Sequence, residues 1–196
     1  MLVPALLAAA AIAVAAYKLT TGPNLPRIAL GLRLPLSTVQ SAAKWARHRH
    51  LPLEWVLATI LVESNGDPNI AGDSGGRSVG LMQVNSVAHA AELAAAGVSR
   101  AALFDPDTNI EWGTKYLAAF RSLVTHALDG KPPPAPLDEI VRLSYKGPQT
   151  VVNALQHGTN PLDISWAPSA IAAWRKAMAR VSSLTHGSLT RGRPTA

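Results

Sequence analysis

The sequence predicts a mainly α-helical domain that follows an N-terminal hydrophobic segment. Apolar residues recur at helical spacing over most of residues 37–185, and no convincing alternating pattern predicts a strand. Residues 1–17 carry no charged side chain. With 196 residues, of which 48% are hydrophobic, the chain can bury one sizeable core but hardly two. We therefore expect one folded domain, residues 37–185, with an appendage at each end.

The N-terminal stretch "MLVPALLAAAAIAVAAY" is interpreted as a membrane segment or an export signal. As a helix, residues 2–17 span only about 24 Å, short of the roughly 30 Å hydrocarbon core, so an anchor would extend to residue 21. The run "AVA" followed by Ala16 fits a signal cleavage site, although a basic start is missing. A buried Ala-rich helix is a third interpretation. We assign residues 1–21 to an anchor or signal.

Residues 22–36 carry three prolines and two glycines and predict a linker rather than a packed element. After this linker, Ser37 or Thr38 can cap a helix through "VQSAAKWARHRH", and Pro52 suits the first turn of a helix that runs to about Glu63. The apolar face of this second helix is formed by Leu53, Val56, Leu57, Ile60 and Leu61. Glu63 falls on that same face.

Five further helices follow from the same apolar spacing. They are predicted over residues 86–97, 107–128, 137–145, 148–157 and 167–184. Gly97 and Gly130 end the first two of them. The run "KPPPAP", residues 131–136, predicts a stiff and exposed loop. Residues 186–196 are expected to be a basic, flexible tail.

The charge balance limits the kinds of partner. The formal net charge is +6, and the excess of lysine and arginine extends into the C-terminal stretch. Such a balance suits an anionic partner such as nucleic acid, anionic lipid or an acidic wall polymer, without choosing among them. There is no cysteine, so disulfides and thiolate metal sites are excluded.

Glu63 is the candidate for chemistry, because it is a carboxylate on an apolar face at a helix end. Burial and the negative end of the helix dipole both favour a protonated carboxyl there. A general acid needs such a proton, for instance to protonate the departing oxygen of a glycosidic bond. From this segment alone, however, a boundary glutamate whose head reaches solvent is the simpler interpretation.

Three later segments change that balance. "ESNGDPN" is followed by "SGGRSVGLMQVN", then by "NIEWGTKYL", then by "SYKGP". In this order, the four segments resemble the lytic transglycosylase family (soluble lytic transglycosylase-like, with a lysozyme fold) over roughly residues 40–180. The resemblance implies a lysozyme-like helical domain with a substrate cleft, and it implies peptidoglycan glycan strands as the substrate.

The resemblance also assigns roles to individual residues. It implies that Glu63 is the single catalytic acid and base, and that Ser64 shapes the turn after it. It implies substrate-binding roles for Ser74, Met82, Gln83 and Tyr145, with Met82 lining the cleft and Tyr145 holding the Glu63 carboxyl in position. It implies structural roles for Gly80, Asn109, Gly113 and Tyr116.

One segment departs from the family pattern. Where the family has Tyr-Asn-x-Gly, this chain has Tyr145-Lys146-Gly147, so either Lys146 replaces the asparagine or the asparagine is deleted. A lysine ammonium close to Glu63 would favour the ionised carboxylate and weaken it as an acid. We therefore expect the Lys146 head to point elsewhere.

The implied reaction uses one carboxylate. Asp67 and Asp73 are better explained as turn and loop residues than as a second catalytic group. By resemblance, Glu63 would protonate the bond between N-acetylmuramic acid and N-acetylglucosamine and then deprotonate the muramyl 6-hydroxyl, which closes a 1,6-anhydro ring. Two alternatives stay open: a lysozyme-like muramidase that uses water, and a wall-binding structural module of a virion or secretion apparatus whose catalysis is impaired.

We expect no cofactor and no metal. "DPDTN" imitates the start of a calcium loop but lacks the required glycine and glutamate, and "RHRH" is interpreted as a solvated helix end. Expected partners are peptidoglycan, a membrane through the N-terminal segment, and a phage virion or a secretion or pilus assembly, but no specific nucleic acid. Because the implied substrate lies outside the inner membrane, we expect periplasmic or other extracytoplasmic action, either as an anchored or exported protein or from a phage virion.

Overall fold

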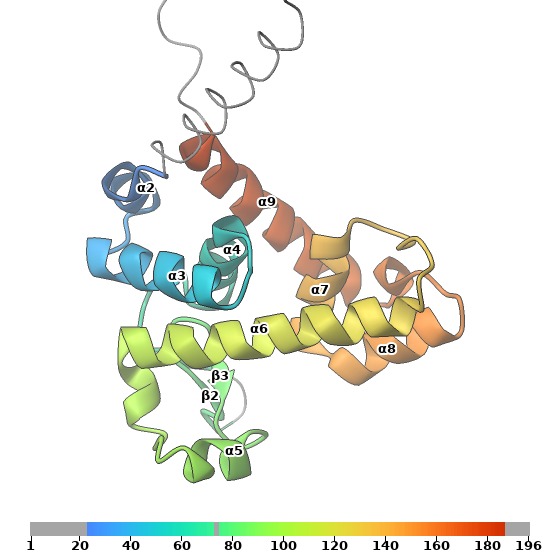
Figure 1. Cartoon of the computed structure of the whole chain (residues 1–196), viewed down its shortest axis with the longest axis horizontal. Helices are drawn as coiled ribbons and strands as arrows, with labels where there is room; N and C mark the ends of the chain where they lie inside the picture. Colours follow the sequence, from blue (N-terminus) through green and yellow to red (C-terminus); the bar gives the residue numbers. More distant parts are fainter. Residues whose placement is uncertain (1–22, 73–74, 187–196) are drawn as a thin grey trace, which may run out of the picture.

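The computed structural model describes residues 23–72 and 75–186. They form a mainly helical domain with one small sheet, which confirms the predicted fold class (Figure 1). The helices are α2 (Leu25–Leu32), α3 (Leu36–His48), α4 (Leu53–Ser64), α5 (Ala90–Ala95), α6 (Pro106–Leu128), α7 (Leu137–Lys146), α8 (Pro148–Gln156) and α9 (Ala167–Thr185). Two 3-10 turns, η1 (Ala102–Phe104) and η2 (Pro161–Asp163), lie between them.

The long helix α6 crosses the molecule, and α3, α7 and α8 pack against it (Figure 1). Asp105 caps its N-terminus by accepting a hydrogen bond from the Thr108 amide at 2.9 Å. Pro106 occupies the first turn, where a missing N–H leaves no bond unmade. The buried side of α6 includes Ile110, Gly113, Leu117 and Val124. The helix predicted over residues 107–128 is thus confirmed within one residue, with "DPDTN" as its cap.

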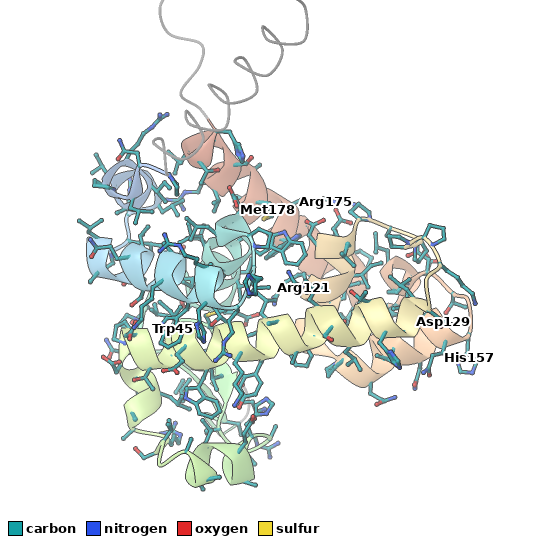
Figure 2. The ribbon with its side chains drawn as sticks, viewed as in Figure 1. Trp45, Arg121, Asp129, His157, Arg175 and Met178 are labelled. Carbon is teal, nitrogen blue, oxygen red and sulfur yellow. The ribbon has the colours of Figure 1, made fainter. Side chains whose placement is uncertain are left out.

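Polar side chains fasten α3 and the turn after it to α6 (Figure 2). The Trp45 indole Nε1 donates to Asp107 Oδ1 at 2.9 Å, and the Lys44 Nζ lies 3.0 Å from Asp107 Oδ2. Further along α6, Arg121 Nη1 donates to the His50 carbonyl at 2.6 Å. These contacts hold α3 across α6, so that α4, which follows α3, begins at a fixed place.

Helix α4 runs through the hydrophobic core and ends at the candidate site. Five consecutive residues on it, 56–60, are 0% exposed. Helix α9 packs along α4 and buries Trp174, whose indole donates to Asp138 of α7 at 2.9 Å. The core therefore joins α4, α7 and α9, the first two of which supply the charged residues of the site.

The apolar spacing did not predict the small sheet. Strands β1 (Ala71–Gly72), β2 (Ser78–Val79) and β3 (Val84–Asn85) pair antiparallel in the order β1-β2-β3. Val79 lies opposite Ala71 on one side and opposite Val84 on the other. Each strand has only two residues, which is too short for an alternating pattern to register. The β2–β3 hairpin carries the segment "GLMQ" into the candidate site.

The predicted linker over residues 22–36 is wrong for residues 25–32, which form α2. Asn24 caps this helix by accepting from the Arg27 amide at 3.0 Å, and Ile28 and Leu32 are buried at 0% and 3% exposure. Arg180 of α9 donates to the Gly31 and Leu32 carbonyls at 3.2 and 3.0 Å. The proline in the first turn was interpreted as a helix breaker, although proline is well tolerated there. The packed domain therefore includes α2.

The other boundaries agree with the sequence more closely. α3 begins at Leu36 and α9 ends at Thr185, close to the predicted limits of 37 and 185, whereas α5 is only half as long as the predicted helix over residues 86–97. "KPPPAP" is a largely exposed loop. The hydrophobic segment predicted over residues 1–21 and most of the predicted tail lie outside the described residues. Within residues 23–72 and 75–186, no helix is both long and apolar enough to cross a membrane.

Candidate active site

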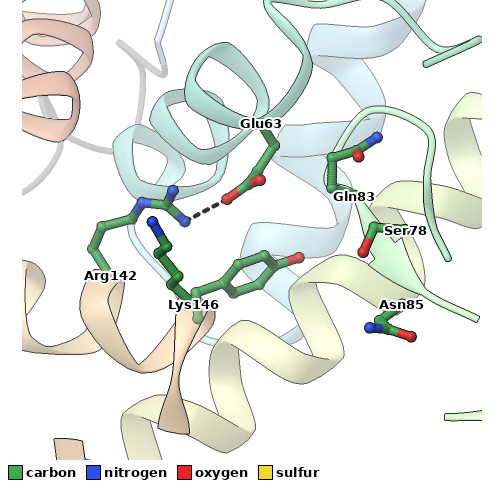
Figure 3. Close-up of a pocket in the computed structure, with 7 residues that line it drawn as sticks. Glu63, Ser78, Gln83, Asn85, Arg142 and Lys146 are labelled. Carbon is green, nitrogen blue, oxygen red and sulfur yellow. Dashed lines mark hydrogen bonds and ion pairs between the residues drawn. The ribbon is translucent and has the colours of Figure 1, made fainter. Parts of the chain in front are cut away.

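A pocket of about 380 Å³ lies between the C-terminal end of α4, the β2–β3 hairpin and α7 (Figure 3). Its lining residues are Glu63, Ser78, Gln83, Asn85, Arg142, Tyr145 and Lys146. Glu63, Gln83, Tyr145 and Lys146 come from three sequence segments that were expected to act together. Ser78, Asn85 and Arg142 were not anticipated. The predicted residue Ser74 lies outside the described residues.

Glu63 is held at the pocket by the way in which α4 ends. The next residue, Ser64, is buried, and its hydroxyl lies 2.8 Å from the Leu81 carbonyl and accepts from the Gly66 amide at 3.1 Å. Asn65 adopts a left-handed conformation, φ 50°, and ends the helix. The Glu63 side chain keeps 20% of its surface exposed. Glu63 is therefore neither sealed in the core nor free in solvent, and Ser64 ties its turn to the hairpin.

Arg142 is the direct partner of Glu63. Its Nη1 donates to Glu63 Oε1 at 2.5 Å, and only 6% of the Arg142 side chain is exposed (Figure 3). A guanidinium at this distance stabilises negative charge on the carboxyl. Sequence reasoning missed this residue. The available signal was its position three residues before Tyr145, which places both side chains on the same face of α7.

Tyr145 does not contact Glu63 in the way predicted for it. Its hydroxyl donates to the Met82 carbonyl at 2.7 Å, so it ties α7 to the hairpin. Burial, together with the nearby negative charge of Glu63, raises the pKa of the Tyr145 hydroxyl. A hydroxyl with a raised pKa remains a donor, which preserves the bond to the hairpin. Arg142, and not Tyr145, holds the Glu63 carboxyl.

Lys146 lines the same pocket as Glu63, one helical turn beyond Arg142. Its Nζ lies 5.3 Å from the ring centroid of Trp166, a distance at which an ammonium is attracted to an aromatic face. In the described part of the chain no ion pair joins it to Glu63. The expectation that the ammonium avoids Glu63 itself therefore holds, but the head stays at the pocket instead of leaving it.

Gln83 is fixed by backbone groups around it. It has φ 49°, and its Nε2 donates to the Gly80 carbonyl at 2.9 Å and to the Ile70 carbonyl at 3.2 Å. Its Oε1 lies close to Gly72, where an added Cβ would come within 2.2 Å of it. The amide thus joins the hairpin to β1. Gln83 also lines the pocket, and its role in binding a ligand stays a prediction.

Met82 does not line the pocket, contrary to the prediction. The residue is 0% exposed, and its side chain packs on Gly113 of α6, where an added Cβ would lie 2.5 Å from the Met82 sulfur. The reason is the direction of the hairpin: Gln83 turns toward the pocket, whereas the preceding side chain enters the core. A Cβ at Gly113 would collide with Met82, so the hairpin approaches α6 closely at this glycine.

Asn109 holds the hairpin in place from α6. The residue is fully buried; its Oδ1 accepts from the Met82 amide at 2.7 Å, and its Nδ2 donates to the Val79 and Leu103 carbonyls at 2.8 and 2.7 Å. Gly80 has φ 76° and lies against the same amide group. These contacts match the structural roles expected for both residues.

Tyr116 joins α6 to α5 and to the residue that precedes α5. Its hydroxyl donates to Glu92 Oε2 at 3.1 Å, and its ring stacks on His89 with 3.6 Å between the ring centroids. Burial raises the pKa of Tyr116 and lowers that of His89. The neutral forms of both rings are therefore favoured in the stack, which is a structural arrangement outside the pocket.

The described pocket residues offer one carboxylate. Among the described residues that line the pocket, Glu63 carries the single carboxylate. Asp67 is exposed, and its Oδ1 accepts from the Asn69 amide at 2.8 Å, which is the turn role expected for it. A lone carboxylate that faces a polar pocket can donate a proton and take one back, but it cannot share that work with a second acid.

A comparison with protein families matches part of the chain. Residues 40–126 match the family model described as the transglycosylase SLT domain. The matched segment contains Glu63, Gln83, Asn109 and Gly113, and it ends before α7. A search of curated proteins found no match.

Proposed function

We propose, on the premise that this chain carries a lytic transglycosylase-like domain, that it cleaves the β-1,4 bond between N-acetylmuramic acid and N-acetylglucosamine in peptidoglycan. The observation that carries the proposal is the position of Glu63. It is the single carboxylate among the described pocket residues, and it lies within the matched segment, residues 40–126. A pair of carboxylates, as ordinary glycosidases use, is not available from those residues.

In the proposed reaction Glu63 acts first as an acid and then as a base. Its proton moves to the glycosidic oxygen as the bond from that oxygen to the muramyl C1 breaks. The ionised carboxylate then accepts the proton of the muramyl 6-hydroxyl, and the bond from O6 to C1 forms. The product is a 1,6-anhydromuramyl end, Glu63 regains its proton, and no water is consumed. The substrate supplies the nucleophile, so a second carboxylate is unnecessary.

The ion pair between Arg142 and Glu63 favours a second candidate function. The Arg142 guanidinium contacts the Glu63 carboxyl at 2.5 Å, so one carboxyl oxygen is already engaged before any ligand arrives. A wall-binding module that kept the fold and lost turnover would tolerate such a pair permanently. The two candidates predict the same ligand and differ only in whether the ligand is cleaved.

The setting that we propose is local opening of the cell wall by a phage virion or by a secretion or pilus system. Its support is the polymer that the domain family implies, together with the uncharged apolar stretch of residues 1–17. Both sources would bring the domain to the wall from outside the cytoplasm. This setting also includes the membrane contact that the N-terminal segment would provide.

Digestion of purified peptidoglycan by the full chain tests the proposed reaction. Mass spectrometry of the released fragments should find 1,6-anhydromuramyl ends, and Glu63→Gln should release none. Reducing muramyl ends would assign the chain to the hydrolases instead. Binding of intact sacculi without any released fragment, by a preparation with the far-UV helical signal of a folded protein, would support the wall-binding module.

A further inference from the structure

Arg142 stands out among the pocket residues because it is a buried cation with bonding capacity left over. Nη1 is used by Glu63, whereas Nε is buried and has no hydrogen-bond partner in the described part of the chain. Buried guanidinium N–H groups are usually paired, since an unpaired one loses its hydration for nothing. The side chain is therefore placed to bind more than the one carboxylate oxygen that it contacts.

Lys146 adds a second positive charge to the same pocket. It follows Arg142 by four residues, so both side chains lie on one face of α7, and both line the pocket (Figure 3). Like charges at this spacing repel each other, and Glu63 neutralises only one of them. The pocket lining, as described, carries two cations and one anion. We call Arg142 and Lys146 the cationic face.

Trp166 keeps the Lys146 ammonium at the pocket. Its indole lies under the ammonium at 5.3 Å and packs against Gly147, where an added Cβ would come within 3.1 Å of the ring. A cation held above an aromatic ring beside a polar pocket is a common arrangement for recognising a charged ligand. Lys146 is thus an exposed charge whose position is restricted, and it lines the same pocket as the buried charge of Arg142.

We propose that the cationic face binds a carboxylate of the glycan and that this carboxylate competes with Glu63 for Arg142. In the free protein Arg142 is a positioning residue that holds the Glu63 carboxyl through a contact of 2.5 Å. When an anionic group of the ligand takes the guanidinium, this ion pair breaks and the Glu63 carboxyl is released toward the ligand.

The ligand class follows from the charge of the cationic face. A carboxylate matches the forked geometry of a guanidinium, and a neutral amino-sugar polymer offers no equivalent group. In a glycan that contains muramic acid, the lactyl carboxyl is such a group wherever no peptide is attached to it. The inference rests on the proposed function for the identity of the polymer, whereas the competition at Arg142 rests on the pocket alone.

Two matched ligands test the inference with the full chain. One is the disaccharide N-acetylglucosaminyl-β-1,4-N-acetylmuramic acid, which lacks the bond that the proposed reaction cleaves. The other is the same disaccharide with the lactyl carboxyl converted to a carboxamide. NMR titrations at pH 7 and low salt should give the carboxylate about tenfold higher affinity, and this preference should shrink as salt is added.

Two variants separate competition from simple attraction. Glu63→Gln should raise the affinity for the carboxylate ligand by about tenfold and leave that for the carboxamide unchanged, because Arg142 then has no rival anion. Lys146→Gln should lower the affinity for the carboxylate ligand alone. The matched control is Lys131→Gln, which removes one exposed lysine of the "KPPPAP" loop and should change neither affinity.

Equal binding of the two ligands by the unaltered protein would overturn the proposal. So would a Glu63→Gln variant whose affinities for both ligands change by the same factor, because a purely structural ion pair predicts that result. If Glu63→Gln fails to fold, Lys146→Gln still decides whether the cationic face selects the carboxylate. Because the disaccharide binding is measured without turnover, failed digestion of peptidoglycan would count against the proposed reaction and leave this inference standing.

Discussion

The Glu63 carboxyl faces the open pocket on one side and contacts the Arg142 guanidinium on the other. The pocket lets a ligand reach the carboxyl, whereas Arg142 occupies one of its oxygens. Sequence reasoning placed Glu63 at the helix end on an apolar face, because both features are local. It did not find Arg142, which is 79 residues away along the chain. A long-range ion pair leaves no periodic trace in either helix, so only the packing of α4 near α7 reveals it.

This ion pair changes what we expect of Glu63→Gln. From sequence alone, the amide resembles a protonated carboxyl and should leave stability equal or improved. With Arg142 buried beside it, the substitution leaves a cation without its counter-charge. We predict a loss of about 1–3 kcal/mol in the free energy of unfolding, measured in urea, together with loss of turnover. A variant that still released muramyl fragments would remove Glu63 from the reaction.

Tyr145 provides a prediction for alkaline pH. Its raised pKa in the folded protein means that the unfolded chain loses the phenolic proton first, at about pH 10. The stability from this group is therefore complete below pH 10 and is lost as pH rises further. Tyr145→Phe removes the group, so the free energy of unfolding should fall less steeply between pH 9 and 11. An unchanged slope would show that the hydroxyl ionises equally in both states.

The same substitution has an effect at neutral pH. Tyr145→Phe leaves the Met82 carbonyl without its donor, which we expect to cost about 1–2 kcal/mol of unfolding free energy. It should weaken turnover less completely than Glu63→Gln, because Tyr145 positions the hairpin and moves no proton. Rates of fragment release from the two variants, compared in one assay, check this order.

At the scale of elements, helices were predictable and the hairpin was not. α4 and α6 are long and have one buried side, so their apolar spacing predicted them to within a residue or two. Strands of two residues have no such spacing, and α2 was hidden by a proline that suits a first turn. The direction of the Met82 side chain depends on the hairpin. Because the hairpin was not predicted, Met82 was wrongly expected to line the cleft.

Gly80 allows the hairpin to be tested directly. An alanine there would be strained at φ 76°, and its Cβ would come within 2.2 Å of the Asn109 amide nitrogen and 2.5 Å of the Leu103 carbonyl. We predict a loss of about 2 kcal/mol or more in unfolding free energy for Gly80→Ala. Gly97→Ala is the control, because it has a similar φ of 70° with no atom within 4 Å. A loss no greater than that of the control would mean that the hairpin shifts to accommodate the added Cβ without losing stability.

Helix α2 can be tested with two leucines on opposite faces. Leu32 is 3% exposed and Leu30 is 83% exposed. We predict that Leu32→Ala lowers the unfolding free energy by about 2–4 kcal/mol, whereas Leu30→Ala changes it by less than about 0.5 kcal/mol. Urea denaturation of both variants checks the difference. Equal effects of the two substitutions would mean that residues 25–32 do not pack against the domain and form a linker, as the sequence predicted.

At the scale of the whole molecule, the candidate site combines residues that lie inside the family match with residues that lie beyond it. The segment that matches the transglycosylase SLT domain, residues 40–126, supplies Glu63 and Gln83. Helix α7 lies beyond that match and supplies Arg142, Tyr145 and Lys146. The sequence predicted pocket residues on both sides, Glu63 and Gln83 within the match and Tyr145 and Lys146 beyond it. It missed Ser78 and Asn85 within the match and Arg142 beyond it.

The proposed location outside the cytoplasm is also a question about the whole chain. Alkaline phosphatase fused after Ala196 should be active in cells, because the enzyme needs an oxidising compartment to form its disulfides. A fluorescent reporter at the same position is the complementary control. Phosphatase that is inactive beside a fluorescent counterpart would place the domain in the cytoplasm and leave delivery by a virion as the remaining route to the wall.

The packing of α4 on α9 has a consequence for synthesis. α4 belongs to the first third of the chain, and its apolar residues have no cover on that side until α9 has left the ribosome. The nascent chain therefore cannot complete its fold for most of its translation. During that time it remains accessible to chaperones and, if it is exported, to a translocation channel. A stop codon placed before α9 would leave that apolar surface permanently open, and the shortened chain would be removed by proteases or would aggregate.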